Sequence, residues 1–244
     1  MSKKRGAKNE KITTSKGTYF WLLFGIIAII CLYVVKEYQY STQKIELDVG
    51  QYNGEPYVTV NNNIPFFEEE DFQASAFETY SELDKWGRCG VAYACVSKEL
   101  MPTEERGEIG MIKPVGWHTV KYPGIIEDLY LYNRCHLIAW CLTGENANEK
   151  NLITGTRYMN IYGMLPFEEM VANYIDRTNN HVLYRVTPMY EGRNLIASGV
   201  LIEAASVEDK GEGISFCVYC YNVQPGIEIN YSTGESWVEG EKKR

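Results

Sequence analysis

The sequence has little positive charge. Its 24 Lys and Arg residues are outnumbered by 32 Asp and Glu residues, which gives a formal net charge of −8 at pH 7. The first 16 residues hold six Lys and Arg against Glu10, a local charge of +5, so residues 17–244 carry −8 − 5 = −13. Tight, non-specific binding of a polyanion depends on Lys and Arg neutralising its charges. The composition therefore argues against such binding, although a metal ion or local arginines can override carboxylates beyond about 8 to 10 Å.

Histidine is also scarce, with three residues in the chain. His118 and His181 have no comparable polar partners in the sequence, so we expect structural or surface roles for both. His136 follows the strand-like run 129–132 and precedes Leu137, where strand-like residues resume, so it should lie where an extended segment turns. A lone histidine near an apolar strand is usually a hydrogen-bonded structural residue, so its interpretation depends on the residues around it.

The cysteine pattern leaves two alternatives open. Outside the apolar N-terminal run there are six cysteines, at positions 89, 95, 135, 141, 217 and 220. They could form disulfides or remain buried free thiols. Cys217 and Cys220 form a C-x-x-C, but residues three apart on a strand face opposite sides, which argues against a zinc site. A nucleophilic Cys135 or Cys141 beside His136 is disfavoured because nothing in the sequence supplies an oxyanion site.

The longest uncharged run is 18–35, with aromatic residues near both ends. About 20 apolar residues span a bilayer, and this run lies within the observed range. No A-x-A-like cleavage site follows it, and Ile30 before Cys31 is not the small residue of lipoprotein processing. We therefore expect a cytoplasmic basic tail over 1–17, a transmembrane signal anchor over 18–35 and a spacer over 36–54, in a single-pass cell-membrane protein with its domain extracytoplasmic. A cleaved signal peptide is the competing interpretation.

Residues 55–232 are long enough for one globular domain, and the pattern predicts an α+β fold with an antiparallel sheet core. Strands are predicted at 56–60, 86–96, 129–132, 181–187, 195–203, 214–223 and 227–231. A helix is predicted with Pro166 at its first position and an end near Asn179. Its apolar stripe comprises Phe167, Met170, Val171, Tyr174 and Ile175. The polar tail 233–244 is expected to fray.

Polar residues with catalytic chemistry follow the run at 129–132. They are Asn133-Arg134-Cys135-His136, then Asn151, Asn160 and Glu168. A neutral imidazole can accept a proton near pH 7. An asparagine carbonyl oxygen is a hard ligand that suits Mg²⁺, which keeps most of its waters and needs few protein groups. A base together with magnesium suggests phosphodiester hydrolysis.

At these positions the sequence resembles the DNA/RNA non-specific endonucleases with a ββα-metal finger (His-Me finger nucleases), and most closely the bacterial membrane-anchored DNA-entry nucleases. The family signature is Asp-Arg-Gly-His, followed by an asparagine, a metal-binding asparagine and a glutamate. The resemblance covers roughly 56–231, and the spacings from Asn151 to Asn160 and from Asn160 to Glu168 are similar to the family's. Two positions differ, because Asn133 replaces the usual aspartate and Cys135 the usual glycine.

The resemblance implies a role for each position. His136 is the general base, Asn160 holds a single Mg²⁺ for which Mn²⁺ can substitute, and Asn151 positions the phosphate or a metal water. Asn133 and Glu168 both hold the water shell of the metal in place. The structural alternative for Glu168 is a favourable interaction with the helix dipole in the first turn of its helix.

Two arginines near this motif are expected to have different roles. Arg106 lies upstream of His136 at about the separation at which family members place an arginine that grips the scissile phosphate. The alternative is a surface arginine paired to Glu104 or Glu108. Arg134 is expected to pack or pair behind the site, because neighbours on a strand point to opposite faces.

The implied function is a Mg²⁺-dependent, sugar-nonspecific endonuclease that hydrolyses DNA, or RNA, at the outer cell surface, with DNA-uptake machinery as a candidate partner. An alternative from another class is a catalytically weak nucleic-acid-binding receptor of a DNA-uptake system. The acidic charge and Asn133 favour this alternative.

Overall fold

The computed structural model of the chain describes residues 21, 24–26, 28, 49–72 and 75–241. The chain divides into two compact units, Met1–Asp48 and Val49–Arg244. In the first unit the described residues are helical, but most of the predicted anchor at 18–35 and all of the basic tail at 1–17 lie outside the described residues. Among the residues that are described, no helix is both long enough and apolar enough to cross a bilayer.

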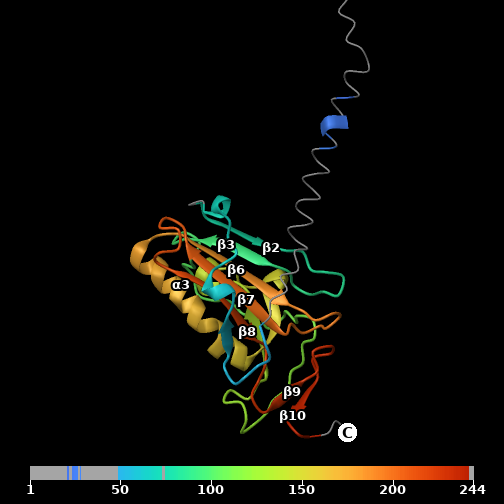
Figure 1. The fold of residues 1–244 in the computed structure, drawn as a ribbon. Helices are drawn as coiled ribbons and strands as arrows, with labels where there is room; N and C mark the ends of the chain where they lie inside the picture. Colours follow the sequence, from blue (N-terminus) through green and yellow to red (C-terminus); the bar gives the residue numbers. More distant parts are fainter. Residues whose placement is uncertain (1–20, 22–23, 27, 29–48, 73–74, 242–244) are drawn as a thin grey trace, which may run out of the picture. The chain divides into compact units, whose positions relative to one another are not determined.

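The second unit is built on a six-stranded antiparallel sheet in the order β1-β8-β7-β6-β3-β2 (Figure 1). The strands are β1 (Tyr57–Thr59), β2 (Phe77–Tyr80), β3 (Ala92–Val96), β6 (Val182–Met189), β7 (Gly199–Ser206) and β8 (Ser215–Tyr221). Short 3₁₀ turns η1 (Asn61–Asn63) and η2 (Glu69–Asp71) lie between β1 and β2. The predicted α+β class with an antiparallel sheet core is confirmed, and β2 is an additional edge strand that the sequence pattern did not predict.

Helix α3 (Leu165–Thr178) lies across one face of this sheet (Figure 1). It begins with Pro166 in its first turn and ends before Asn179, whose φ of 59° is left-handed, as the capping pattern predicts. Four of the five predicted stripe residues are buried, but Met170 is 46% exposed because it lies at the edge of the stripe. At the opposite edge of the stripe, Glu168 is buried.

A hairpin precedes α3 and carries the motif. It pairs β4 (Tyr132–His136) with β5 (Leu152–Thr156), so that His136 lies opposite Leu152. The connection contains the short helix α2 (Trp140–Thr143) and the 3₁₀ turn η3 (Glu149–Asn151). After β5 the chain forms a π-helical turn, η4 (Met159–Met164), that continues into α3. Two antiparallel strands are thus followed by a helix.

The cysteines on β8 follow the predicted alternation. Cys220 joins Phe216 and Val218 in the core between the sheet and α3, whereas Cys217 faces the other side of the sheet. All six cysteines within 49–241 are free thiols. Of the two alternatives left open by the sequence, the structure has the unbridged one.

The two ends of the domain differ from their predicted boundaries. The expected spacer is wrong from Val49 onward, because the Val49 carbonyl accepts a hydrogen bond of 2.5 Å from Tyr221 Oη, and the Tyr52 ring packs edge-on against Tyr158 and Tyr221. The expectation of a frayed tail is wrong as far as Val238. There β10 (Ser236–Val238) pairs with β9 (Ile227–Ile229), because antiparallel backbone hydrogen bonds hold a strand of three residues whose side chains show no sequence pattern of their own.

Candidate active site

His136 ends β4 with its side chain only 6% exposed. Its Nε2 lies 2.8 Å from the Asn146 carbonyl oxygen. Because a carbonyl can only accept, Nε2 carries the ring proton and Nδ1 carries the lone pair. Burial lowers the pKa of His136 to about 4, with a smaller contribution in the same direction from the charge of Arg106, while the bond to Asn146 opposes the shift. The imidazole is therefore neutral at pH 7 and able to accept a proton at Nδ1.

Arg106 contacts this base directly, since its Nη2 lies 3.3 Å from His136 Nδ1. No ion pair joins Arg106 to Glu104 or Glu108 in the described part of the chain, so the surface-pair alternative is not what the structure shows. The positive charge of Arg106 also acts to lower the pKa of Glu168. The structure therefore brings a planar cation to the base and within electrostatic range of the carboxylate.

Asn151, which was predicted to position the phosphate or a metal water, has its side chain bonded to the backbone of Ile138. Its side chain is completely buried. Its Oδ1 accepts from the Ile138 backbone N–H at 2.8 Å, and its Nδ2 donates to the Ile138 carbonyl at 2.9 Å. Both polar ends of the amide are thereby occupied, so Asn151 holds the backbone two residues beyond His136 rather than reaching a substrate.

Glu168 lies in the first turn of α3, where only 9% of the residue is exposed. Burial raises the pKa of its carboxyl group to about 8, and the Arg106 charge partly opposes this shift. Among the described residues, no hydrogen bond or ion pair holds the side chain of Glu168 or that of Asn160 on η4. A buried carboxylate without a partner is costly, so this position favours a cation or a protonated acid.

The donors present fit a magnesium-like ion. Within the described ranges there is no group of three or more His, Cys, Asp and Glu that could hold a metal, which argues against a site built wholly from such side chains. Asn160 instead offers an amide oxygen and Glu168 a carboxyl group, both without a side-chain partner among the described residues, and Mg²⁺ needs few protein ligands because it retains waters. Asn160 and Glu168 are therefore the residues that could hold such an ion.

The remaining motif residues divide between the two faces of the hairpin. Arg134 donates to the Gly110 and Ile112 carbonyls, and its guanidinium lies 4.1 Å from the Trp117 ring centroid, so it packs and pairs with the segment 110–117. Because it is two residues from His136 on β4, it shares a face of the strand with His136, and the expectation that the two lie on opposite faces is wrong. Asn133 is partly buried. By alternation, Asn133 and Cys135 lie on the face of β4 opposite to Arg134. No hydrogen bond joins Asn133 or Asn160 to His136 within 75–241.

Comparison with known proteins identifies the family. Residues 70–208 match the family model described as DNA/RNA non-specific endonuclease. The chain belongs to this family. The predicted family and class of enzyme, a nuclease, are thereby confirmed. A deoxyribonuclease from Streptococcus dysgalactiae subsp. equisimilis is 34% identical over 126 residues, which cover 50% of this chain and 37% of that protein, so the match spans little more than a third of the relative.

Two solved structures share the fold of this endonuclease-family chain. NucA from Streptococcus agalactiae with a magnesium ion bound superposes with a TM-score of 0.69 at 23% identity, covering 84% of this chain and 96% of that one. The Sda1 nuclease with a bound zinc ion superposes with a TM-score of 0.64 at 24% identity, covering 76% and 97%. At these identities the likeness establishes the fold, an α+β architecture with a large antiparallel sheet.

One contributor to the site was missed from the sequence. Asn146 uses its backbone carbonyl to orient His136, and a backbone role leaves no trace in residue type. The other two histidines behave as expected: exposed His118 contacts the Thr233 carbonyl at 3.0 Å, and His181 pairs with Glu208 at 2.6 Å. Neither has a partner of the kind that surrounds His136.

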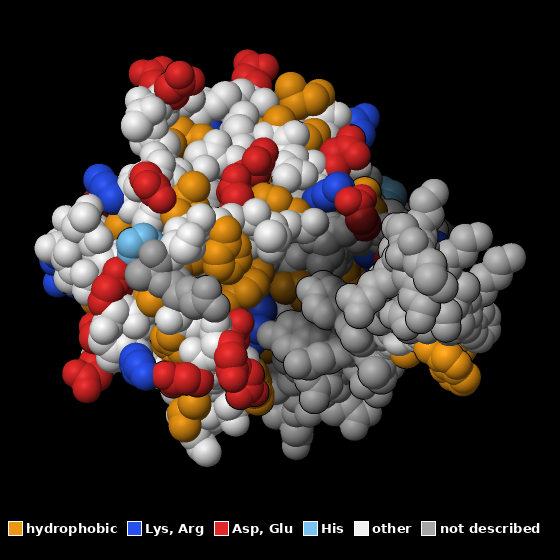
Figure 2. Space-filling view, turned by 90° about the horizontal axis from the view of Figure 1, so that it is seen from above, with side chains coloured by type: hydrophobic (Ala, Val, Ile, Leu, Met, Phe, Trp, Pro, Cys, Tyr) orange, Lys and Arg blue, Asp and Glu red, His pale blue; other side chains and the backbone are white. Residues whose placement is uncertain are grey.

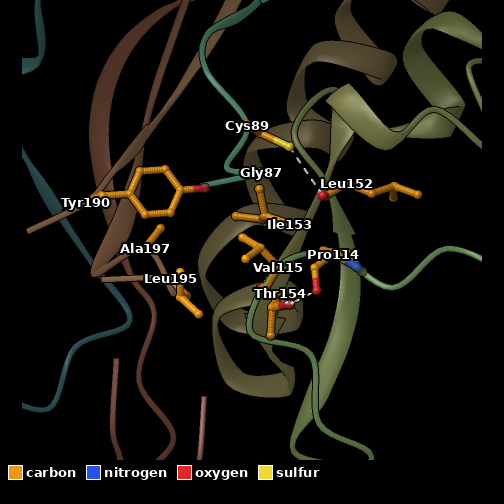
Figure 3. A pocket seen from close by; sticks show the side chains of 10 residues that line it. All are labelled: Gly87, Cys89, Pro114, Val115, Leu152, Ile153, Thr154, Tyr190, Leu195 and Ala197. Atoms are coloured by element: carbon orange, nitrogen blue, oxygen red, sulfur yellow. Dashed lines mark hydrogen bonds between the residues drawn. The ribbon is translucent and has the colours of Figure 1, made fainter. Parts of the chain in front are cut away.

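A small pocket beside β5 is separate from this site (Figure 3). Ten residues line it: Gly87, Cys89, Pro114, Val115, Leu152, Ile153, Thr154, Tyr190, Leu195 and Ala197. None of them belongs to the predicted set, and the lining is mostly apolar, with the Cys89 thiol donating to the Leu152 carbonyl at 3.3 Å. The pocket is a packing gap behind the hairpin rather than a place for a charged substrate.

The surface agrees with the acidic composition. Figure 2 shows Asp and Glu side chains spread over one face, with Lys and Arg between them and no continuous basic area there. Several described cations are paired with acids: Arg88 with Asp84, Lys98 with Asp176, Lys150 with Glu82, Arg157 with Asp128, and Lys210 with Glu69. Long-range attraction of a polyanion therefore has little support on this face.

Proposed function

We propose that this protein is a Mg²⁺-dependent, sugar-nonspecific endonuclease that hydrolyses DNA phosphodiester bonds, with RNA as a second substrate. The observation that carries the proposal is the buried His136, whose tautomer leaves Nδ1 free to accept a proton and whose Nδ1 touches Arg106. The ions bound to NucA and Sda1 support a divalent metal, and Mn²⁺ is expected to substitute for Mg²⁺.

His136 is the proposed general base. Its Nδ1 takes a proton from the attacking water, while the Asn146 carbonyl holds the Nε2 proton and so keeps the ring oriented. Arg106 transfers its hydrogen bond from Nδ1 to the phosphate, which a guanidinium can bind through two N–H groups. This transfer frees the lone pair, and the negative phosphate favours the protonated imidazole that forms. Asn151 maintains the backbone conformation after His136 and is a positioning residue.

Asn160 is the residue proposed to hold the cation, and Asn133 and Glu168 are proposed to order the water around it. When bound, the cation offsets negative charge on the pentavalent phosphorus and the departing 3′ oxygen. The family resemblance implies 5′-phosphorylated products. The two strands and the helix that carry these residues then form the ββα-metal finger of the fold.

A surface location is also proposed. The basic tail at 1–17 and the uncharged run at 18–35 support a signal anchor with the N-terminus cytoplasmic and the domain outside. DNA at the cell surface would then be the substrate, and DNA-uptake machinery a candidate partner. Protease treatment of intact cells should remove the domain if it is outside, and protection of the domain would contradict this location.

Digestion of plasmid DNA and of RNA by the purified full-length chain tests the enzymatic proposal. Mg²⁺ or Mn²⁺ should support cleavage and a chelator should abolish it. His136→Ala should lower kcat by about 10²- to 10⁴-fold, the usual contribution of a general base. His181→Ala, which removes a surface histidine, is the matched control and should cleave like the wild type. Equal activity of the His136 variant would refute its assignment as the base.

The second candidate function is a nucleic-acid receptor with weak catalysis. The net charge of −13 outside the N-terminal tail and the replacement of the usual aspartate by Asn133 favour it. Saturable DNA binding without cleavage under any metal condition would support this candidate. Asn133→Asp would then be expected to restore cleavage, because it returns a negative charge to the family position.

A further inference from the structure

A π-helical turn lies between Asn160, proposed to hold the cation, and Glu168, proposed to order its water shell. In η4 the Leu165 backbone N–H donates to the Asn160 carbonyl, which is an i→i+5 bond. Residues 157–158 before η4 are α-helical, and regular α-helix resumes at Leu165. Asn160 lies in η4, and Glu168 lies one turn into α3. Single π turns inside helices are rare and occur frequently at functional sites.

The wider turn changes which side chains share a face of the helix. At about 100° per residue, eight residues of α-helix would leave Asn160 and Glu168 roughly 80° apart around the axis. A π turn takes about 4.4 residues, because its hydrogen bond spans one residue more than the α bond. With half of the eight residues in η4, Asn160 and Glu168 are separated by about two full turns and lie on one stripe.

The burial of neighbouring side chains agrees with this alignment. Met164, midway between Asn160 and Glu168, is completely buried, and Asn160 itself is partly buried. Tyr162, which the same geometry places on the opposite side of η4, is 53% exposed. The stripe that contains Asn160, Met164 and Glu168 therefore faces the protein, and the Tyr162 side faces outward.

Gly163 lets this turn lie against the sheet. A Cβ at this position would be 3.2 Å from Cys220 Cβ on β8 and 3.6 Å from the Pro56 carbonyl oxygen. The first contact is tighter than an ordinary Cβ contact, so a methyl group at Gly163 requires Cys220 or η4 to shift by a few tenths of an ångström. Because Gly163 belongs to the π turn, any displacement would be passed to Asn160 within the same turn.

We propose that the π turn is a positioning device, which rotates Asn160 onto the stripe of Glu168, and that Gly163 packs this turn against β8. The Asn160 oxygen then faces the cation from the same side as Glu168, which lies about 12 Å further along the helix axis and reaches the water shell of that ion. The inference rests on the proposed function, since it assumes that Asn160 and Glu168 serve the same ion. It adds a reason for their eight-residue spacing and assigns Gly163 a role as a positioning residue.

Changing the length of the turn tests the proposal, with Mn²⁺ affinity of the full-length protein measured by electron paramagnetic resonance. Deletion of Tyr162 leaves a seven-residue spacing, which is two turns of regular α-helix, so alignment and Mn²⁺ affinity should stay within about fivefold of the wild type. Insertion of one alanine after Tyr162 rotates Asn160 off the stripe and should weaken Mn²⁺ binding about tenfold or more. An alanine inserted after Arg177, beyond Glu168, is the matched control and should leave affinity unchanged.

Gly163→Ala tests the packing of η4 against β8 without changing the chain length. It should weaken Mn²⁺ binding about fivefold or more, whereas a merely structural glycine would lower the unfolding temperature and leave affinity intact. The proposal is overturned if the folded deletion variant loses the ion, or if both the insertion variant and Gly163→Ala bind it like the wild type. If instead Asn160→Ala leaves wild-type Mn²⁺ affinity unchanged, the proposed function itself fails at this residue, and the inference fails with it.

Discussion

Arg106 Nη2 lies 3.3 Å from Nδ1 of His136, so the guanidinium covers the one ring nitrogen that carries a lone pair. The other ring nitrogen is held by the Asn146 carbonyl. An incoming phosphate competes with the imidazole for the same cation. The base therefore becomes available when a phosphodiester binds, and this links two residues that are 30 positions apart in the sequence.

Replacement of Arg106 should affect both the substrate and the base. Arg106→Ala should lower kcat/KM by about 10- to 100-fold, because charge-assisted hydrogen bonds are worth about 1.5–3 kcal/mol. The pKa of His136 should rise once the neighbouring charge is removed, yet stay below its ordinary value because burial is the larger cause of its shift. Imidazole NMR titration measures this, with Arg106→Lys as the control that retains the charge. An unchanged pKa in the alanine variant would show that the two side chains do not interact in solution.

Asn151→Ala should destabilise the protein rather than remove a substrate contact. The variant leaves the Ile138 N–H and carbonyl without partners in a buried position, so we expect a loss of about 2–4 kcal/mol in the free energy of unfolding. Urea unfolding measures the loss. Asn148→Ala, which removes one partly buried bond to the Lys150 N–H, should cost about 1 kcal/mol. Wild-type stability together with lost activity would return Asn151 to the role that the family resemblance implies.

Gly155 and Cys135 should behave as a size-compensating pair on neighbouring strands. A Cβ at Gly155 would overlap Cys135 Sγ and lie 2.7 Å from Met159 Cε, so Gly155→Ala should cost about 1–3 kcal/mol. Cys135→Gly, which introduces the residue usual in the family, removes the overlapping sulfur. The double variant should be more stable than the sum of the two single effects, as a double-mutant cycle of unfolding free energies would show. Strictly additive losses would contradict the pairing.

Glu168 should make stability depend on pH when no metal is present. Its pKa is about 8 in the folded protein and 4.5 ordinarily, so between these values the folded state keeps a proton that the unfolded state has released. Stability must then fall as pH rises through this window. Glu168→Gln removes the titration, so its stability relative to the wild type should grow between pH 6.5 and 8 by up to about 1.4 kcal/mol per unit. Unfolding with a chelator present measures this.

The pH range from 6.5 to 8 separates the titration of Glu168 from that of His136. The pKa of His136 is lowered to about 4, so its own contribution to stability rises with pH and is complete above its ordinary value of 6.5. Glu212→Gln changes an exposed carboxylate and should follow the wild type throughout. A difference between wild type and Glu168→Gln that stays flat from pH 6.5 to 8 would mean that the carboxyl group is ionised in the folded protein.

Local patterns predicted the parts of the fold that local forces decide. The apolar spacing from Phe167 to Ile175, with Pro166 before it and Asn179 after it, defined α3 correctly because helix period and capping act within a few residues. The alternation on β8 placed Cys217 and Cys220 on opposite faces for the same reason. These features need no knowledge of distant segments.

Arg106 and Asn151 were predicted as site residues, but the contacts that they and Asn146 make were not, because those contacts depend on the tertiary structure. Arg106 reaches His136 from a loop, Asn146 acts through its backbone, and Asn151 turns inward because Ile138 presents two unpaired backbone groups. The π turn is invisible to residue type because its extra residue is accommodated by packing on β8. The motif thus supplied the candidate residues, whereas the contacts that each of them makes required the fold.

The packing of Tyr52 on Tyr158 has a mechanical consequence. Tyr158 lies two residues before Asn160, and its hydroxyl donates to the Gly54 carbonyl and accepts from Tyr52 Oη at 3.3 Å. Tension applied to the polypeptide at Val49 would therefore be transmitted through this pair of rings to the start of η4. A shortened version of the enzyme that begins at residue 55 would lose this brace, so trimming should start no later than Val49.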